Sequence, residues 1–197
     1  MRYAVLMVAM GLVVGAAGAT IPDADYCTVT PCDAYGAVLM CPDYSIALGM
    51  VSPIADTQFT VNVRNGNNDP IPAAYVEIVL GTPGNHVLCA DAVLTGTTDV
   101  NGDVTFNISG GGCTLGTDAV RIIANTYEIR SYAAAKSPDF VTGTGGSGYV
   151  DLSDFGEFAA CYGSPACPCH DYDGDGTVLL ADFGMFAAAY GHKCQEL

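Results

Sequence analysis

The chain has 197 residues, of which 21 are acidic and 6 are Lys or Arg, so its formal net charge is −15 at pH 7. This charge excludes nucleic acid as a partner, because affinity for phosphate backbones comes mainly from Lys and Arg, and it disfavours binding to anionic membranes. Half of the residues are hydrophobic and only 14% are charged, which indicates folded domains rather than a disordered acidic chain.

Residues 1–19 have the composition of an export signal. Arg2 precedes an apolar run over residues 3–16, and the small residues Ala17-Gly18-Ala19 form a cleavage site before Thr20. As a transmembrane anchor this run would be short, since a helix needs about 20 apolar residues to span a bilayer. The sequence therefore predicts a secreted or cell-surface protein.

All nine cysteines follow the signal, which is typical of an exported protein stabilised by disulfides. We expect Cys89 to pair with Cys113, and Cys169 to pair with Cys194. Because nine is odd, at least one thiol stays free or forms an intermolecular disulfide. The alternative is a zinc site in residues 167–170 (Cys-Pro-Cys-His), although structural zinc usually requires two residues between paired cysteines.

The segment 20–56 contains three cysteines and no sustained hydrophobic period, so we expect a loop-like segment tied by disulfides. Between residues 57 and 136, apolar residues alternate with polar ones in short runs separated by turn sequences, which predicts strands with one buried face. Asn101-Gly102 is a strong hairpin signal, and Gly110-Gly111-Gly112 is interpreted as a strand-end turn. These features predict an antiparallel β-sandwich over residues 57–136. The alternating runs are Phe59, Val61 and Val63; Val76, Ile78 and Leu80; Val104, Phe106 and Ile108; and Val120, Ile122 and Ala124.

Two stretches resemble the immunoglobulin-like and prealbumin-like surface domains of bacteria. Residues 69–76 read Asp-Pro-Ile-Pro-Ala-Ala-Tyr-Val, and residues 96–106 contain the Asn-Gly turn. The resemblance covers residues 57–130, and it implies a spacer, stalk or adhesive module without an active site. The residues agree with this, because no Ser lies in a Gly-x-Ser-x-Gly motif. We expect no catalytic residues and no enzyme activity.

An internal repeat is the clearest signal in the chain. Residues 150–163 align with residues 178–191 at an offset of 28 and are identical at 10 of 14 positions. In each copy, two phenylalanines, an alanine and a tyrosine recur at i, i+3, i+4 and i+7, which predicts an amphipathic helix. We expect these aromatic residues to pack the two helices together, and Gly163 and Gly191 to end the helices in a left-handed conformation.

The segment before the second helix has the spacing of an EF-hand-like calcium loop. Asp171, Asp173, Asp175 and Asp182 occupy loop positions 1, 3, 5 and 12, and the carbonyl of Thr177 lies at position 7. Calcium prefers six to eight oxygen ligands, and this spacing wraps carboxylates around one ion. Asp182 replaces the Glu of helix-loop-helix sensors, and no helix pattern precedes the loop. The sequence therefore predicts a Ca²⁺ site.

This duplicated loop-helix unit resembles the dockerin module of secreted bacterial proteins, over residues 137–197. The resemblance implies a cohesin-binding face near loop positions 10 and 11, which are Leu152, Ser153, Leu180 and Ala181. The predicted fold is thus mainly a β-sandwich, immunoglobulin-like, followed by a small α-helical dockerin-like calcium-binding module.

The first copy of the loop departs from the pattern and leaves two alignments open. Counting back from Asp154 without a gap places Gly143, Gly145 and Ser147 at positions 1, 3 and 5. A four-residue insertion would instead make Asp139 position 1, so that Asp139, Asp151 and Asp154 form an altered calcium site with carbonyls from the glycine-rich loop. We favour the altered site.

The first functional hypothesis is an exported, non-catalytic protein whose calcium-binding module attaches a β-sandwich to a cohesin-like partner or surface assembly. The alternative is a small accessory or catalytic component of a polysaccharide-degrading complex, since dockerins often follow such enzymes. A purely structural secreted or surface protein with a calcium-stabilised tail is the third.

Overall fold

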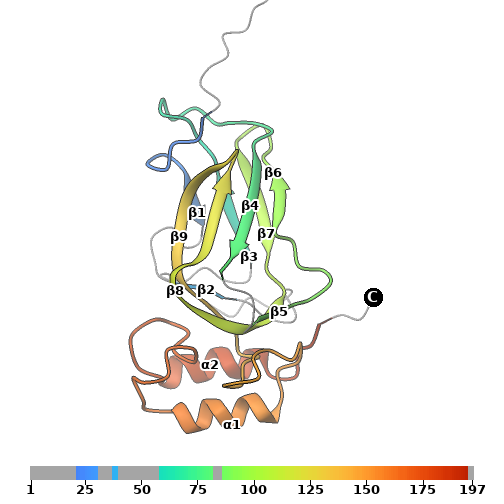
Figure 1. The fold of residues 1–197 in the computed structure, drawn as a ribbon, viewed down its shortest axis with the longest axis vertical. Coiled ribbons are helices and arrows are strands. Elements are labelled where there is room, and N and C mark those ends of the chain that lie inside the picture. The colour runs from blue at the N-terminus through green and yellow to red at the C-terminus, as the bar shows by residue number, and fades with distance from the viewer. Residues whose placement is uncertain (1–20, 31–36, 40–57, 82–85, 195–197) are drawn as a thin grey trace, which may run out of the picture.

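The computed structural model describes residues 21–30, 37–39, 58–81 and 86–194. The predicted export signal, Cys32 and Cys41 lie outside these residues. Two β-sheets form the upper part of the molecule, and two helices lie beneath one end of them (Figure 1). Among the described residues, no helix has both the length and the apolar character needed to cross a membrane.

The two sheets are mainly antiparallel, and their facing sides share one hydrophobic core. The first sheet has the order β1-β3-β7, and the second has the order β2-β9-β8-β4-β6, with β5 paired to β8. Only the β2–β9 pair is parallel among the described strands. This architecture fits a β-sandwich. The strands are β1 Thr28–Thr30, β2 Ala37–Leu39, β3 Gln58–Asn62, β4 Tyr75–Leu80, β5 His86–Leu88, β6 Thr95–Thr97, β7 Asp103–Asn107, β8 Gly110–Ala124 and β9 Tyr127–Lys136.

The four alternating runs expected from the sequence fall on or beside β3, β4, β7 and β8, and they supply most of the core. All of their apolar residues are buried except Leu80 and Val104, which pack against the core while partly exposed. Burying apolar area stabilises the fold by roughly 25 cal/mol per Å². The alternation is therefore sufficient to fix which face of each strand points inward.

Five strands were not predicted from the sequence: β1, β2, β5, β6 and β9. The segment expected to be loop-like contains β1 and β2, which add to opposite sheets. Strand β9 shows no clean alternation, because it forms the partner of β8 across two register shifts. At such irregularities, successive side chains no longer alternate between the faces.

The predicted hairpin at Asn101-Gly102 and the predicted strand-end turn at residues 110–112 are wrong. Asn101-Gly102 does form a turn, with Gly102 at φ 83°, but it joins β6 to β7, which belong to different sheets. It therefore crosses the sandwich instead of closing a hairpin. The three glycines at 110–112 lie inside β8, where a Cβ on Gly111 would overlap the Asp139 carboxylate. Their small size lets the strand approach the segment that follows β9.

The expected disulfide partners were also wrong, although the same four cysteines are used. Cys89 pairs with Cys194, and Cys113 pairs with Cys169. Each bridge joins the sheets to the segment after residue 136, so the two parts of the chain are covalently linked twice.

The remaining described cysteines account for a third disulfide and one thiol. Cys161 pairs with Cys167, which leaves no thiolate in residues 167–170 for a zinc ion. Cys27 is a free, buried thiol, and its Sγ atom contacts the backbone N–H and C=O of Arg64. Cys27 therefore forms no disulfide that would tie the N-terminal segment.

Candidate metal centre

The two copies of the repeat form helices α1 (Leu152–Cys161) and α2 (Leu180–Ala189), as the sequence predicts. Gly163 and Gly191 follow these helices with φ of 79° and 87°, which is the left-handed conformation expected there.

The two copies are also related in space. The backbone N–H of Gly163 donates to the carbonyl of Val178, and the N–H of Gly191 donates to the carbonyl of Val150. Gly163 and Gly191 are equivalent positions of the repeat, and so are Val150 and Val178. Each of the two hydrogen bonds is therefore the repeat-related copy of the other. Each loop therefore pairs with the end of the other helix, which gives the module an approximate two-fold symmetry.

The second loop brings three carboxylates together. Ligand-type oxygens of Asp171, Asp173 and Asp175 lie within 4.8 Å of one another, and no other group of this kind occurs among the described residues. Each of these carboxylates accepts a hydrogen bond from the loop backbone, including those from Asp175 N (3.1 Å) and Thr177 N (2.8 Å). The loop therefore holds its acidic side chains facing one centre.

Asp182 closes the loop from the first turn of α2. Its carboxylate is fully buried and accepts hydrogen bonds from the N–H groups of Tyr172 (2.6 Å) and Leu179 (2.8 Å). It thereby links the beginning of the loop to the N-terminus of the helix, where a negative charge is favourable. Asp182 does not belong to the 4.8 Å group, so the structure brings together three of the five predicted ligand residues and holds Asp182 at the start of α2.

In the first loop, the structure favours the alignment with an insertion. Asp154 accepts a hydrogen bond from Asp151 N (2.8 Å), just as Asp182 does from Leu179 N. Asp139 is fully buried, and its carboxylate accepts from Ser147 N (2.8 Å) and Gly148 N (2.7 Å). Asp139 thus takes the place that Asp171 has in the second loop.

The three acidic residues of the first loop are arranged differently from those of the second. Asp151 caps α1 by accepting from Ser153 N (2.7 Å), and a cavity of about 380 Å³ adjoins the glycine-rich segment. Asp139, Asp151 and Asp154 do not form a group within 4.8 Å. The first loop therefore has ends like those of the second, but its acidic side chains are not gathered as closely.

Burial makes the charged form of several of these carboxyl groups less favourable. Burial raises the pKa of Asp154 to about 6, against hydrogen bonds that lower it. Burial likewise raises the pKa of Asp139, and it raises that of Asp173 together with the charges of its acidic neighbours. A divalent cation bound by oxygen ligands would offset this cost, and the three carboxylates of the second loop are the type of donor that calcium prefers.

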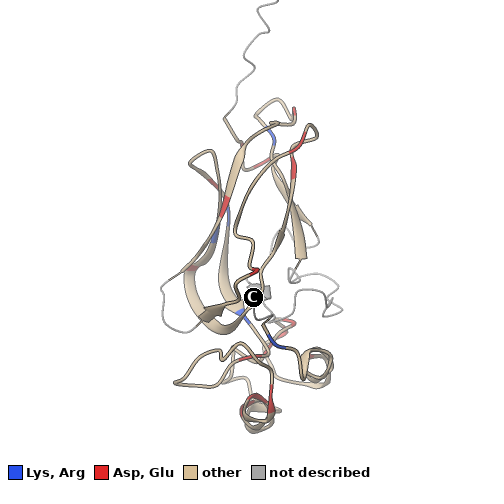
Figure 2. Cartoon of the chain, turned by 90° about the vertical axis from the view of Figure 1, so that its right-hand side faces the viewer, with Lys and Arg blue, Asp and Glu red and all other residues tan. Residues whose placement is uncertain are grey.

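A basic residue from the sheets also reaches the second loop, and sequence reasoning missed it. Lys136 ends β9 and is only 5% exposed. Its Nζ atom donates to the carbonyl of Asp171 and lies 3.9 Å from the Oδ2 atom of the same residue. Burial lowers the pKa of the Lys136 ammonium group, and the negative charge of Asp171 opposes that shift. No sequence signal identified this contact, because the two residues are 35 positions apart. Basic residues are scarce across the molecule, as the few blue segments of Figure 2 show.

The helices present an aromatic surface that is partly exposed. Phe158 and Phe186 are buried and stack at the helix interface, with ring centroids 5.2 Å apart, as the sequence led us to expect. Phe155 and Phe183, each 39% exposed, do not bury fully. Some of the repeated aromatic residues therefore face solvent.

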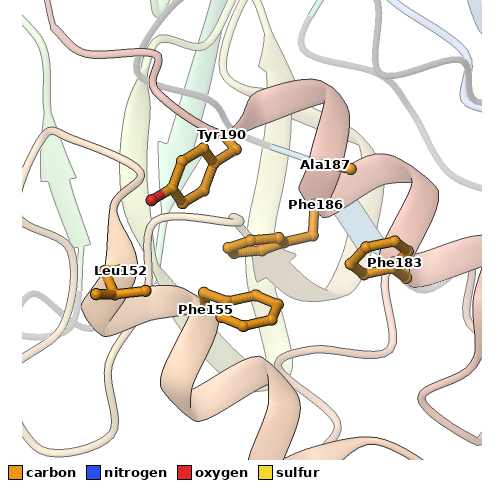
Figure 3. Close-up of a pocket in the computed structure, with 6 residues that line it drawn as sticks. All are labelled: Leu152, Phe155, Phe183, Phe186, Ala187 and Tyr190. Atoms are coloured by element: carbon orange, nitrogen blue, oxygen red, sulfur yellow. The ribbon is translucent and has the colours of Figure 1, made fainter.

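Two apolar pockets of about 400 Å³ each lie on this surface. In the first, Leu152 and Phe155 of α1 face the aromatic residues of α2 (Figure 3). The second pocket is lined by the repeat-related residues, so that Leu180 replaces Leu152 and Tyr162 replaces Tyr190. We call these two pockets and their rims the aromatic face.

The predicted partner-binding residues lie at the ends of the aromatic face. Leu152 and Leu180 are 70% and 71% exposed, which is unusual for large aliphatic side chains. Ser153 and Ala181 are also exposed. All four begin the helices, next to the two candidate calcium loops.

Comparison with known proteins gives little further information. No protein-family model matches this chain, and no curated protein matches it. A similar solved structure is described as a C-terminal interface mutant of a type II cohesin-X-dockerin complex from Acetivibrio cellulolyticus. The match covers 66% of this chain and 90% of that chain, with 18% identity and a TM-score of 0.29. A TM-score this low does not establish a common fold.

Proposed function

We propose that this protein is an exported, non-catalytic docking protein. A dockerin-like, calcium-binding module (residues 137–197) would attach the β-sandwich to a cohesin-like partner within a surface assembly. The observation that carries the proposal is the aromatic face, because it repeats across two loop-helix units and leaves Leu152 and Leu180 about 70% exposed. Exposed apolar surface of this kind is typical of protein interaction sites.

Calcium would organise this face through the loops beneath it. Asp171, Asp173, Asp175, the Thr177 carbonyl and Asp182 would hold an ion in the second loop. In the first loop, Asp139, Asp151 and Asp154 would hold another. The bound ion supplies the positive charge that keeps these acidic side chains together. Because Asp154 and Asp182 lie in the first turns of α1 and α2, the loops set the positions of both helices.

An immunoglobulin-like topology for the sandwich is part of the proposal. The order β1-β3-β7 corresponds to strands A, B and E of that fold, and β9-β8-β4-β6 corresponds to strands G, F, C and C′. Domains of this kind serve as spacers or adhesive modules, which suits a docked surface protein.

Two observations support export and the absence of catalysis. Three disulfides among the described cysteines suit an oxidising compartment. His170, next to the second loop, is 2% exposed and packs against Phe140 and Phe158, so it cannot reach a substrate.

The proposal is tested by measuring binding of residues 20–197 to purified type I and type II cohesin domains, in calcium and in chelator. We expect binding in calcium only, and we expect Leu152→Asp with Leu180→Asp to abolish it. Val100→Asp is the matched control, because Val100 is 79% exposed on the sandwich. If no cohesin domain binds, the docking function is refuted and a purely structural, calcium-stabilised tail is favoured. Binding that survives both the double variant and chelator would place the contact elsewhere.

A further inference from the structure

The end of β9 places a positive charge beside the first residue of the second candidate calcium loop. Lys136 is 5% exposed, and its ammonium group both donates to the carbonyl of Asp171 and pairs with its carboxylate. The chain has only two lysines, and the other, Lys193, is exposed. A scarce basic residue is therefore buried beside position 1 of a loop that is otherwise acidic.

The sheet fixes the position of this charge. Lys136 pairs with Cys113 of β8, and Cys113 forms a disulfide with Cys169, two residues before Asp171. Two neighbouring positions of the sheet thus hold the same end of the loop, one by a covalent bond and one by charge. The backbone of Lys136 therefore stays beside the start of the loop as long as the strand pairing and the disulfide hold.

A fixed ammonium group acts in opposite directions on the two states of the loop. Without a metal ion, it offsets the repulsion among the carboxylates of Asp171, Asp173 and Asp175, so it stabilises the loop. With a calcium ion bound, it repels the ion, because the energy between like charges varies inversely with their distance. The same side chain should therefore favour the metal-free state and oppose the bound state.

We propose that Lys136 sets the calcium affinity of the second loop by acting as a built-in counter-ion. It keeps the loop folded when calcium is absent, and it weakens calcium binding. This inference rests on the proposed calcium-binding function of the loop. It also makes a residue of the sandwich a regulator of the module that follows it.

The test uses residues 20–197 with the disulfides intact, and it compares the parent with Lys136→Met. Calorimetric titration with calcium chloride should show binding at least tenfold tighter for Lys136→Met. Thermal unfolding in chelator should show a lower melting temperature for the same variant. Lys136→Arg keeps the charge and should bind calcium within about threefold of the parent. Lys193→Met removes the same charge from an exposed site and should match the parent in both measurements.

A merely structural lysine would give a different result. If Lys136→Met loses stability equally in calcium and in chelator, and its affinity for calcium equals that of the parent, the inference is wrong while the calcium site stands. A parent that binds no calcium refutes the proposed function and the inference with it. Should Lys136→Met fail to fold, Lys136→Gln carries the same expectation, because its amide can still donate to the Asp171 carbonyl.

Discussion

Replacing Asp173 and Asp175 by asparagine tests the second loop most directly. Asparagine keeps the side-chain oxygens that accept hydrogen bonds from the N–H groups of Asp175 and Thr177, so the local turns are preserved. The double variant removes two of the three negative charges that lie within 4.8 Å of one another. It therefore separates the effect of charge from the effect of loop shape.

The distance between the carboxylates gives the size of the expected change in stability. Two unit charges about 5 Å apart repel by roughly 1 kcal/mol in water and by about 3 kcal/mol at an effective dielectric constant of 20. Asp175 is exposed and Asp173 is half-buried, so the lower value applies. In chelator, the variant should be as stable as the parent or more stable, by about 1–2 kcal/mol. With free calcium at a hundred times the dissociation constant, the parent should gain about 2.7 kcal/mol and the variant should gain nothing.

Thermal unfolding in calcium and in chelator measures both effects. A gain of about 2.7 kcal/mol corresponds to a rise of roughly 5–10 °C in the melting temperature of a chain of this size. Asp25→Asn with Asp69→Asn is the control, since both residues are exposed on the sandwich and carry the same total charge. A loop variant that gains as much from calcium as the parent would show that Asp173 and Asp175 are not ligands.

Three further predictions concern the rest of the molecule. Phe158→Ala should cost about 3–5 kcal/mol in chemical unfolding, because the ring is 1% exposed and stacks on Phe186; a cost below 1 kcal/mol would contradict this packing. Replacing Cys113 and Cys169 together by alanine should cost about 4 kcal/mol, since the bridge closes a separation of 56 residues, and non-reducing peptide mapping should find these two cysteines joined in the parent. Burial raises the pKa of the Cys27 thiol above its ordinary value of 9.0, so the unfolded chain loses this proton first and the associated stability disappears as the pH rises through the folded pKa. The urea concentration at the midpoint of unfolding should therefore fall more between pH 7 and pH 10 for the parent than for Cys27→Ala. An equal fall in both proteins would show that the Cys27 thiol is not buried in its protonated form.

The sequence determined the elements whose signal is local. Alternating apolar residues were enough to locate β3, β4, β7 and β8, because a strand buried on one face must place its apolar side chains at every second position. The 28-residue repeat located α1 and α2 and the glycines that end them. The spacing of Asp171, Asp173 and Asp175 located the group of carboxylates, since those residues are close in the chain as well as in space.

The tertiary structure decided everything that depends on residues distant in the chain. The sequence offered the right four cysteines for two bridges but not their pairing, because pairing depends on which segments the fold brings within about 6 Å. It favoured the alignment of the first loop with an insertion but could not show how Asp139 and Asp154 are held, which depends on hydrogen bonds from Ser147, Gly148 and Asp151. The contact between Lys136 and Asp171 was likewise invisible, since it forms only where the end of β9 meets a loop 35 residues further along. Local periodicity fixes which face of an element is buried, whereas the partners of a buried charge or thiol are fixed by the packing of the whole chain.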